Sequence, residues 1–194
     1  MIKTVMTMMV CASLFAGCGS DPEDNKDQSA RTAQVPDGVL VSTPPPGAAR
    51  IPAVKAAAKV GDEVVIRGRA GGQRDGVFND AYATAMLVDI MTPITCSLDS
   101  TCGCKTPWDY CCGDKKVKRS NTALVRLTDA KGKTLPGTLK GVGGLDYFSL
   151  VTVRGKISRI SEGGDLVIDA TELCVEPKGE LKRGMIGDGG SDYK

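Results

Sequence analysis

The stretch DEVVIRGRA, residues 62–70, sets the apolar Val64 and Ile66 against arginines on the alternate positions. Successive side chains of a β-strand point to opposite faces, so this period-two pattern predicts a strand with one buried face. Four other stretches show the same pattern: residues 84–91, 122–128, 150–157 and 166–175. Residues 137–145 hold too many glycines for a stable helix and predict a short turn or helical connection. The expected order is three strands, a connection and two strands.

Three phrases within these strands are similar to those of a known fold family: VVIRGR at 64–69, VTVRGK at 151–156 and LVIDA at 166–170. They resemble the OB-fold, most closely the branch found in tRNA-anticodon-type and helicase-type nucleic-acid-binding domains. In that family a glycine lets the first and fourth strands coil around a small barrel, which the last strand closes. The resemblance implies an all-β, five-stranded OB-like small barrel over residues 51–178, with a small β-sandwich as the competing fold. It implies no particular ligand, because this fold hosts many functions.

The charge and composition of the chain exclude several classes of activity. Its 194 residues include 25 Lys+Arg and 23 Asp+Glu, so the net charge of +2 provides no global field for nucleic acid. Histidine is absent, which removes Ser-His and Cys-His catalytic pairs and imidazole metal sites. The glycine-rich residues 141–144 lack the Lys-Ser/Thr of a phosphate-binding loop. We therefore expect a protein that is not an enzyme and that carries no cofactor.

The N-terminus has the order of a secretory signal peptide. A short start with one positive charge precedes an apolar run that is too short to span a bilayer permanently. The run ends in LFAGC at residues 14–18, which resembles the lipobox of bacterial lipoproteins, although Phe15 stands where leucine is usual. The resemblance implies a signal peptide over residues 1–17, acylation of Cys18, and an outer-membrane destination because Gly19 is not aspartate. An ordinary signal peptide with a chance cysteine is the alternative.

Two polar stretches flank the expected domain. Residues 19–50 are rich in Asp, Ser, Gln, Pro and Gly, and the three prolines at 44–46 favour a stiff polyproline segment. Together with the lipidated cysteine, residues 18–50 are expected to form a disordered tether, in which only residues 39–41 are compatible with an edge strand. Residues 179–194 are rich in Gly and Asp and are expected to form a flexible tail.

A cysteine-rich insert, residues 92–121, is expected between the second and third strands. With Cys11 removed and Cys18 lipidated, six cysteines remain: Cys96, Cys102, Cys104, Cys111, Cys112 and Cys174. An even number in an oxidising compartment favours three disulfides, with Cys174 joining the insert to the last strand. The alternative is a thiolate metal site for zinc, iron or copper(I), built from Cys102, Cys104, Cys111 and Cys112. A redox-active pair ranks third, because the sequence contains no Cys-x-x-Cys.

The insert also holds the candidate ligand-binding side chains. Trp108 and Tyr110 lie between the cysteines, either as a platform of rigid aromatic anchors or as a small core that packs the loop. A basic cluster follows, formed by Lys115, Lys116, Lys118 and Arg119. It is suited to phosphate or anionic lipid headgroups, or it is a solvated loop surface.

These observations predict a lipoprotein of the bacterial cell envelope with a disulfide-linked OB-like binding or scaffolding domain of unknown ligand. The alternatives are a thiolate lipoprotein that binds copper or zinc, and a domain that binds polyanions or nucleic acid through its barrel face and basic loop. The expected partners are the membrane, through the lipid anchor, and another envelope protein. Export, and the lack of aromatic residues in the second and third strands, argue against a nucleic-acid partner.

Overall fold

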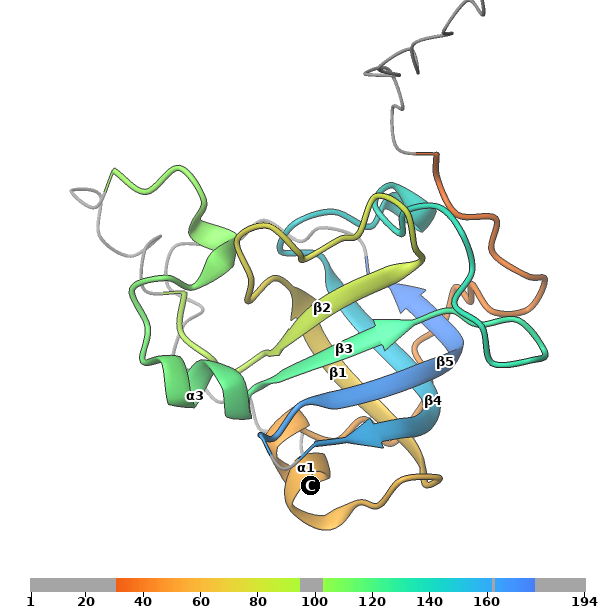
Figure 1. The fold of residues 1–194 in the computed structure, drawn as a ribbon, viewed down its shortest axis with the longest axis horizontal. Helices are drawn as coiled ribbons and strands as arrows, with labels where there is room; N and C mark the ends of the chain where they lie inside the picture. Colours follow the sequence, from red (N-terminus) through yellow and green to blue (C-terminus); the bar gives the residue numbers. More distant parts are fainter. Residues whose placement is uncertain (1–30, 95–102, 162, 177–194) are drawn as a thin grey trace, which may run out of the picture.

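The computed structural model describes residues 31–94, 103–161 and 163–176 (Figure 1). Five strands account for most of it: β1 (Glu63–Ala70), β2 (Thr84–Asp89), β3 (Thr122–Arg126), β4 (Leu150–Ile160) and β5 (Leu166–Val175). Short helices connect them: α1 (Ile51–Ala57), η1 (Pro107–Asp109), α3 (Lys115–Ser120) and η2 (Val142–Gly144). The strands begin and end within a few residues of the predicted stretches, and η2 falls inside the predicted connection.

The strands form a closed barrel in the order β1-β2-β3-β5-β4, which β1 and β4 complete. The β3–β5 pair is parallel and the other pairs are antiparallel. The predicted all-β fold with a closed barrel of five strands is therefore confirmed. Residues between β2 and β3 form the insert, of which the described part begins again at Gly103.

Two glycines let adjacent strands of the barrel approach closely. A Cβ on Gly155 in β4 would lie 2.4 Å from the Asp169 carbonyl oxygen in β5, and the pairing of these strands shifts register between Arg154 and Gly155. A Cβ on Gly68 in β1 would lie 2.9 Å from the Val88 carbonyl oxygen in β2. Any larger residue would push adjacent strands apart, so these positions need glycine for space.

The core lies inside the barrel, and α1 closes one end of it. Alternate side chains of every strand point inward and are almost fully buried, among them Ile66, Leu87, Val125, Val153 and Ile168. Helix α1 adds two buried apolar side chains, one of them Ile51. The buried Asp89 carboxylate at the end of β2 holds this helix, because it accepts hydrogen bonds from the Ile51 N–H (3.1 Å) and the Arg50 guanidinium (2.7 Å).

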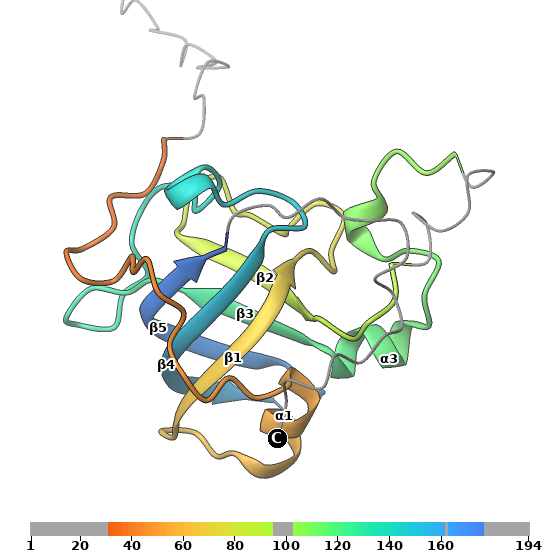
Figure 2. The same cartoon turned by 180° about the vertical axis from the view of Figure 1, so that it is seen from behind.

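The segment before α1 corrects the predicted domain boundary. Residues 31–50, expected to belong to a disordered tether, lie against the outside of the barrel (Figure 2). The Ala33 N–H donates to the Thr138 carbonyl (2.8 Å), and Val39 and Val41 exchange hydrogen bonds with Leu173 in β5. Their few apolar side chains pack on the core, which composition alone could not reveal. The ordered domain therefore begins well before residue 51.

The predicted signal peptide, Cys18 and the tail at 179–194 lie outside the described residues. The same is true of Cys96 and Cys102. Within the described ranges, none of the helices combines the length and the apolar character that crossing a bilayer requires.

Candidate functional site

The described part of the insert folds onto the glycines that follow β1. The Gly72 N–H donates to the Trp108 carbonyl (2.7 Å), and a Cβ on Gly71 would lie 2.8 Å from that oxygen. Gly72 also has a positive φ of +97°, which a residue with a side chain rarely adopts. The Gly71-Gly72 pair thus lets η1 approach the barrel and positions the cysteines and lysines that follow it.

The two aromatic side chains of the insert pack inward. The Trp108 ring stacks on Tyr147, with 4.2 Å between centroids and 18° between planes, over the main core. Tyr110 is only 2% exposed and packs with Val88 and Ile94 in a second small cluster. Burial removes Tyr110 from the candidate ligand-binding residues and agrees with the alternative that these rings pack the loop.

Burial also changes the ionisation of Tyr110. Desolvation raises the pKa of its phenol to about 12, although the positive charge of nearby Arg69 opposes the rise. No described residue makes a hydrogen bond of standard geometry with the phenol oxygen, and the Arg69 side chain is the polar group that acts on it. A phenol that remains protonated and buried has no access to a ligand, so Tyr110 contributes to the packing of the insert.

A cluster of thiols and one carboxylate lies just beyond η1. The Sγ atoms of Cys104 and Cys111 and a carboxylate oxygen of Asp109 all lie within 4.8 Å of one another. The Cys104 and Cys111 sulfurs are 3.8 Å apart, and the Cys112 sulfur is 3.7 Å from that of Cys111. These distances exceed the disulfide bond length of about 2.05 Å, and no disulfide joins the four described cysteines to one another. The three disulfides therefore stay a prediction.

Cys174 occupies a different environment from the insert cysteines. It lies on β5 and is 2% exposed, whereas Cys111 and Cys112 are exposed and Cys104 is partly buried. Desolvation, together with the negative charge of Glu176, raises the pKa of the Cys174 thiol. Cys174 is thus a buried thiol of the barrel wall, while the other three form a surface group.

Asp109 is the member of the cluster that the sequence analysis missed. Its buried carboxylate accepts hydrogen bonds from the Cys111 N–H (2.7 Å) and the Thr106 hydroxyl (3.0 Å), and Arg74 lies 3.7 Å away. Burial alone would raise the pKa of this carboxyl, but hydrogen bonds from the Cys111 thiol and N–H and from Thr106, with the Arg74 charge, lower it. The Thr-x-x-Asp-x-Cys spacing was the available signal, because an aspartate bonds readily to nearby backbone and hydroxyl groups.

Helix α3 positions the predicted basic cluster. The Asp114 carboxylate caps its first turn by accepting from the Lys116 and Val117 N–H groups (2.8 and 2.9 Å). At its other end the Arg119 carbonyl accepts from the Lys55 ammonium of α1 (2.7 Å). These contacts hold the helix beside the start of β3, with most of its basic side chains exposed to solvent.

The basic side chains line a solvent-open pocket of about 710 Å³. Its floor is the outer face of β2 and β3, at Met86 and Thr122, and its walls are α3 and the residues that follow Gly71. Its cations are Arg74, Lys115, Lys116, Lys118 and Arg119, and its one carboxylate is Asp165 from the β4–β5 loop. The structure therefore brings the four predicted basic residues together and adds Arg74, which the sequence left 41 residues from Lys115.

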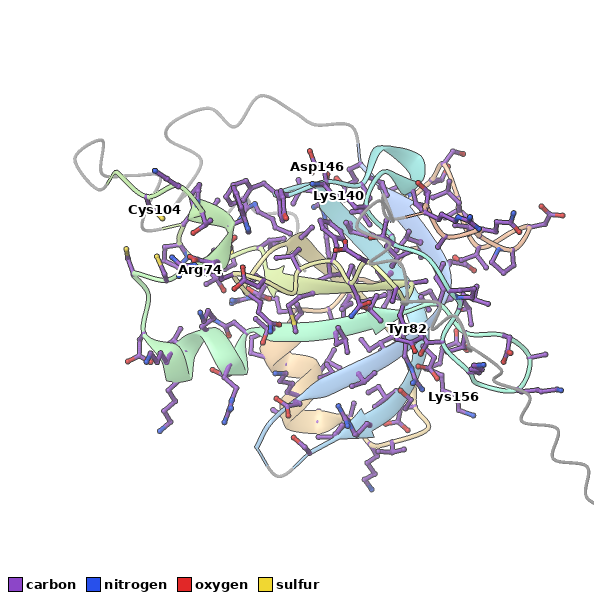
Figure 3. All side chains as sticks on the ribbon, turned by 45° about the horizontal axis from the view of Figure 1, so that its top comes forward. Arg74, Tyr82, Cys104, Lys140, Asp146 and Lys156 are labelled. Carbon is purple, nitrogen blue, oxygen red and sulfur yellow. The ribbon has the colours of Figure 1, made fainter. Side chains whose placement is uncertain are left out.

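A second pocket of about 650 Å³ lies further along the same face of β2 and β3. Asp75, Asp80, Phe78 and Tyr82 contribute to its lining. It carries carboxylates where the first pocket carries cations, so the charge of this barrel face changes sign along the strands. Figure 3 shows Arg74 and Cys104 on one side of the molecule and Tyr82 on the other.

The arrangement offers two chemistries on one side of the barrel. The pocket beside α3 provides charge-assisted hydrogen bonds to anionic groups, and the thiol–carboxylate cluster provides soft ligand atoms for a metal ion. Lys118 links the two, since its ammonium donates to the Asp109 carbonyl (3.1 Å). Comparison with known proteins finds no matching family model, no matching curated protein and no matching solved structure.

Proposed function

We propose that the protein is an acyl-anchored lipoprotein of the bacterial cell envelope whose OB-like barrel binds an anionic polysaccharide. The observation that carries the proposal is the basic pocket on the β2–β3 face, where five cations stand against one carboxylate. OB-folds bind oligonucleotides and oligosaccharides on this strand face, between the loops that join β1 to β2 and β4 to β5. Both of those loops contribute to the pocket, through Arg74 and Asp165.

The lining favours an anionic sugar polymer over single-stranded nucleic acid. Sequence-independent binding of single strands depends on aromatic side chains on which the bases stack. The described residues that line the pocket include no Phe, Tyr or Trp, and Trp108 is stacked on Tyr147 instead. Binding through charge alone suits carboxylate, sulfate or phosphate groups repeated along a chain, such as those of envelope polysaccharides.

A membrane anchor would bring the barrel close to the proposed ligand. The proposed anchor at Cys18 precedes the described domain, which begins at residue 31. A short polar connection would hold the barrel close to the membrane surface, where envelope polysaccharides are concentrated. Replacing Cys18 by Ala is expected to abolish acylation and release the protein from the membrane; a variant that stays acylated and membrane-bound would refute the anchor.

Binding is tested with heparin, a sulfated polysaccharide, and the exported full-length chain. We expect an affinity that falls steeply as salt rises, because binding releases condensed counterions. In the variant with Lys115→Glu and Lys116→Glu, two exposed cations become anions. Each reversal changes the charge by two units, so at about 1 kcal/mol per unit of charge in high dielectric the two reversals cost about 4 kcal/mol, and the affinity at low salt should fall by about a thousand-fold.

The matched control changes Lys131→Glu and Lys133→Glu. These lysines are also exposed, and they lie in the turn after β3, at the opposite end of the strand from α3 (Figure 1). Both double variants change the net charge equally, so only the pocket variant should lose affinity. Equal loss in the two variants would show attraction to overall charge and would refute the pocket. Tighter binding of a single-stranded oligonucleotide than of heparin would instead favour a nucleic-acid ligand.

A further inference from the structure

We propose that Cys104, Asp109, Cys111 and Cys112 form a binding site for one Zn²⁺ ion. The site adjoins the anion pocket, whose Arg74 and Lys118 contact Asp109, but it does not depend on the proposed function. Its basis is the convergence of three ligand atoms, from Cys104, Asp109 and Cys111, within 4.8 Å of one another. The Cys112 sulfur lies 3.7 Å from that of Cys111 but outside this group of three, so Cys112 serves as the fourth donor only after its side chain turns toward the ion.

The spacing of the sulfur atoms matches a tetrahedral metal centre. Zinc binds thiolates at about 2.3 Å, and two ligands at that distance in tetrahedral geometry are about 3.8 Å apart. The observed separations are 3.8 Å between Cys104 and Cys111 and 3.7 Å between Cys111 and Cys112. A zinc ion on Cys104, Asp109 and Cys111 therefore needs no change in the Cys104–Cys111 distance, whereas binding by Cys112 as well needs a movement of that side chain toward Cys104 and Asp109.

The carboxylate of the cluster is already oriented by its neighbours. The Thr106 hydroxyl and the Cys111 N–H donate to the two oxygens of Asp109, at 3.0 and 2.7 Å. Hydrogen bonds of this kind hold a metal ligand in place before the ion arrives. Asp109 is buried, whereas Cys111 and Cys112 are exposed, so the site has a fixed inner side and an open side through which the ion enters.

The donor set selects the metal. Three thiolates favour soft ions such as zinc, copper(I) and the iron of iron–sulfur clusters, but a carboxylate oxygen is a poor ligand for copper(I). Zinc accepts sulfur and oxygen ligands together in a four-coordinate site. Each thiol loses its proton to solvent when its sulfur binds, so zinc binding releases up to three protons and involves no redox step.

The first test measures zinc in the full-length chain purified from the envelope without reductant or chelator. We expect about one zinc per chain, and thiols at Cys104, Cys111 and Cys112 that alkylating reagents reach only after zinc is removed. Disulfides at these positions in the exported protein would overturn the proposal. So would reduced thiols with no zinc, if adding zinc alone to that protein also gives no binding.

Variants then assign the ligands by the absorption spectrum of Co²⁺ substituted for zinc. Cys104→Ser should remove a sulfur-to-cobalt charge-transfer contribution and weaken metal affinity by at least about a hundred-fold. Cys174→Ala removes a thiol outside the cluster and should leave both spectrum and affinity unchanged. Because Cys104→Ser could disturb folding, Asp109→Asn serves as a second variant, with about ten- to hundred-fold weaker binding expected while all thiols remain.

The same measurements keep the two proposals apart. The Lys115→Glu and Lys116→Glu variant should bind zinc as the unaltered protein does, while losing affinity for heparin. If Cys104→Ser and Asp109→Asn both bind metal as tightly as the Cys174→Ala control, with the same Co²⁺ spectrum, the zinc site is refuted. That result would leave the proposal for the anion pocket unaffected.

Discussion

Replacing Gly155 by Ala tests the steric argument for the barrel directly. The new Cβ would lie 2.4 Å from the Asp169 carbonyl oxygen, 2.7 Å from Ile168 Cγ2 and 2.9 Å from Ala170 Cα. Two of these are backbone atoms of β5, which cannot turn away as the end of a side chain can. Reaching even a 3.0 Å contact requires β4 and β5 to separate by about 0.6 Å at the register shift between Arg154 and Gly155.

The expected cost follows from this overlap. Overpacking of a well-packed interior costs about 1–3 kcal/mol, while the lower entropy of the unfolded alanine chain returns about 0.4–1 kcal/mol. Because backbone atoms receive the overlap, we expect an overpacking cost near the upper end of its range. After the entropy gain is subtracted, the free energy of unfolding should fall by about 2 kcal/mol. That is a large fraction of the 5–15 kcal/mol typical of a domain.

The assay is urea unfolding followed by the fluorescence of Trp108, the only tryptophan, which is stacked on Tyr147. Gly163→Ala is the matched control, because its Cβ would meet nothing nearer than Ser161 Oγ at 3.6 Å, an ordinary contact. The control should be neutral or slightly stabilising. If Gly155→Ala unfolds at the same urea concentration as Gly163→Ala, the close approach of β4 and β5 is not a constraint, and the reasoning is wrong.

Two further predictions concern buried polar groups. Tyr110→Phe should change stability by less than about 1 kcal/mol near neutral pH, since no described residue makes a hydrogen bond of standard geometry with the phenol and Arg69 acts on it mainly through its charge. With a pKa of about 12 in the folded protein, against about 10 when unfolded, this phenol binds more protons in the folded state above pH 10, so stability falls as pH rises. Urea unfolding measures this effect: by about pH 11 the unaltered protein should lose about 1.4 kcal/mol more of its free energy of unfolding than Tyr110→Phe loses. Equal losses in the two proteins would contradict the raised pKa of Tyr110. Asp89→Asn should cost about 2–3 kcal/mol, because the amide cannot accept from the Ile51 N–H, the Met91 N–H and the half-exposed Arg50 together. Hydrogen exchange of the α1 amides should accelerate, and unchanged protection of Ile51 to Ala57 would show that Asp89 does not hold the helix.

The strands of the barrel could be predicted because they depend on the pattern of residues that are neighbours in the sequence. Alternation of apolar and polar residues along 62–70 or 166–175 reports one buried face, whatever the strand pairs with. The resemblance implied a glycine that lets the first and fourth strands coil, and the structure shows that Gly68 and Gly155 lie where these strands approach their neighbours closely. The segment at 31–50 was misjudged because its order depends on hydrogen bonds to residues far along the chain, such as Thr138 and Leu173.

The candidate sites show the same division. The sequence by itself determined the five strands, the absence of histidine chemistry and the clustering of the basic residues at 115–119, which the structure places on the short helix α3 and not in a loop. Only the tertiary structure decided that Arg74 completes the basic pocket, that Asp109 joins Cys104 and Cys111, and that Tyr110 is buried. Periodicity and composition are properties of neighbouring residues, whereas a binding site depends on distances between side chains that closure of the barrel alone brings together.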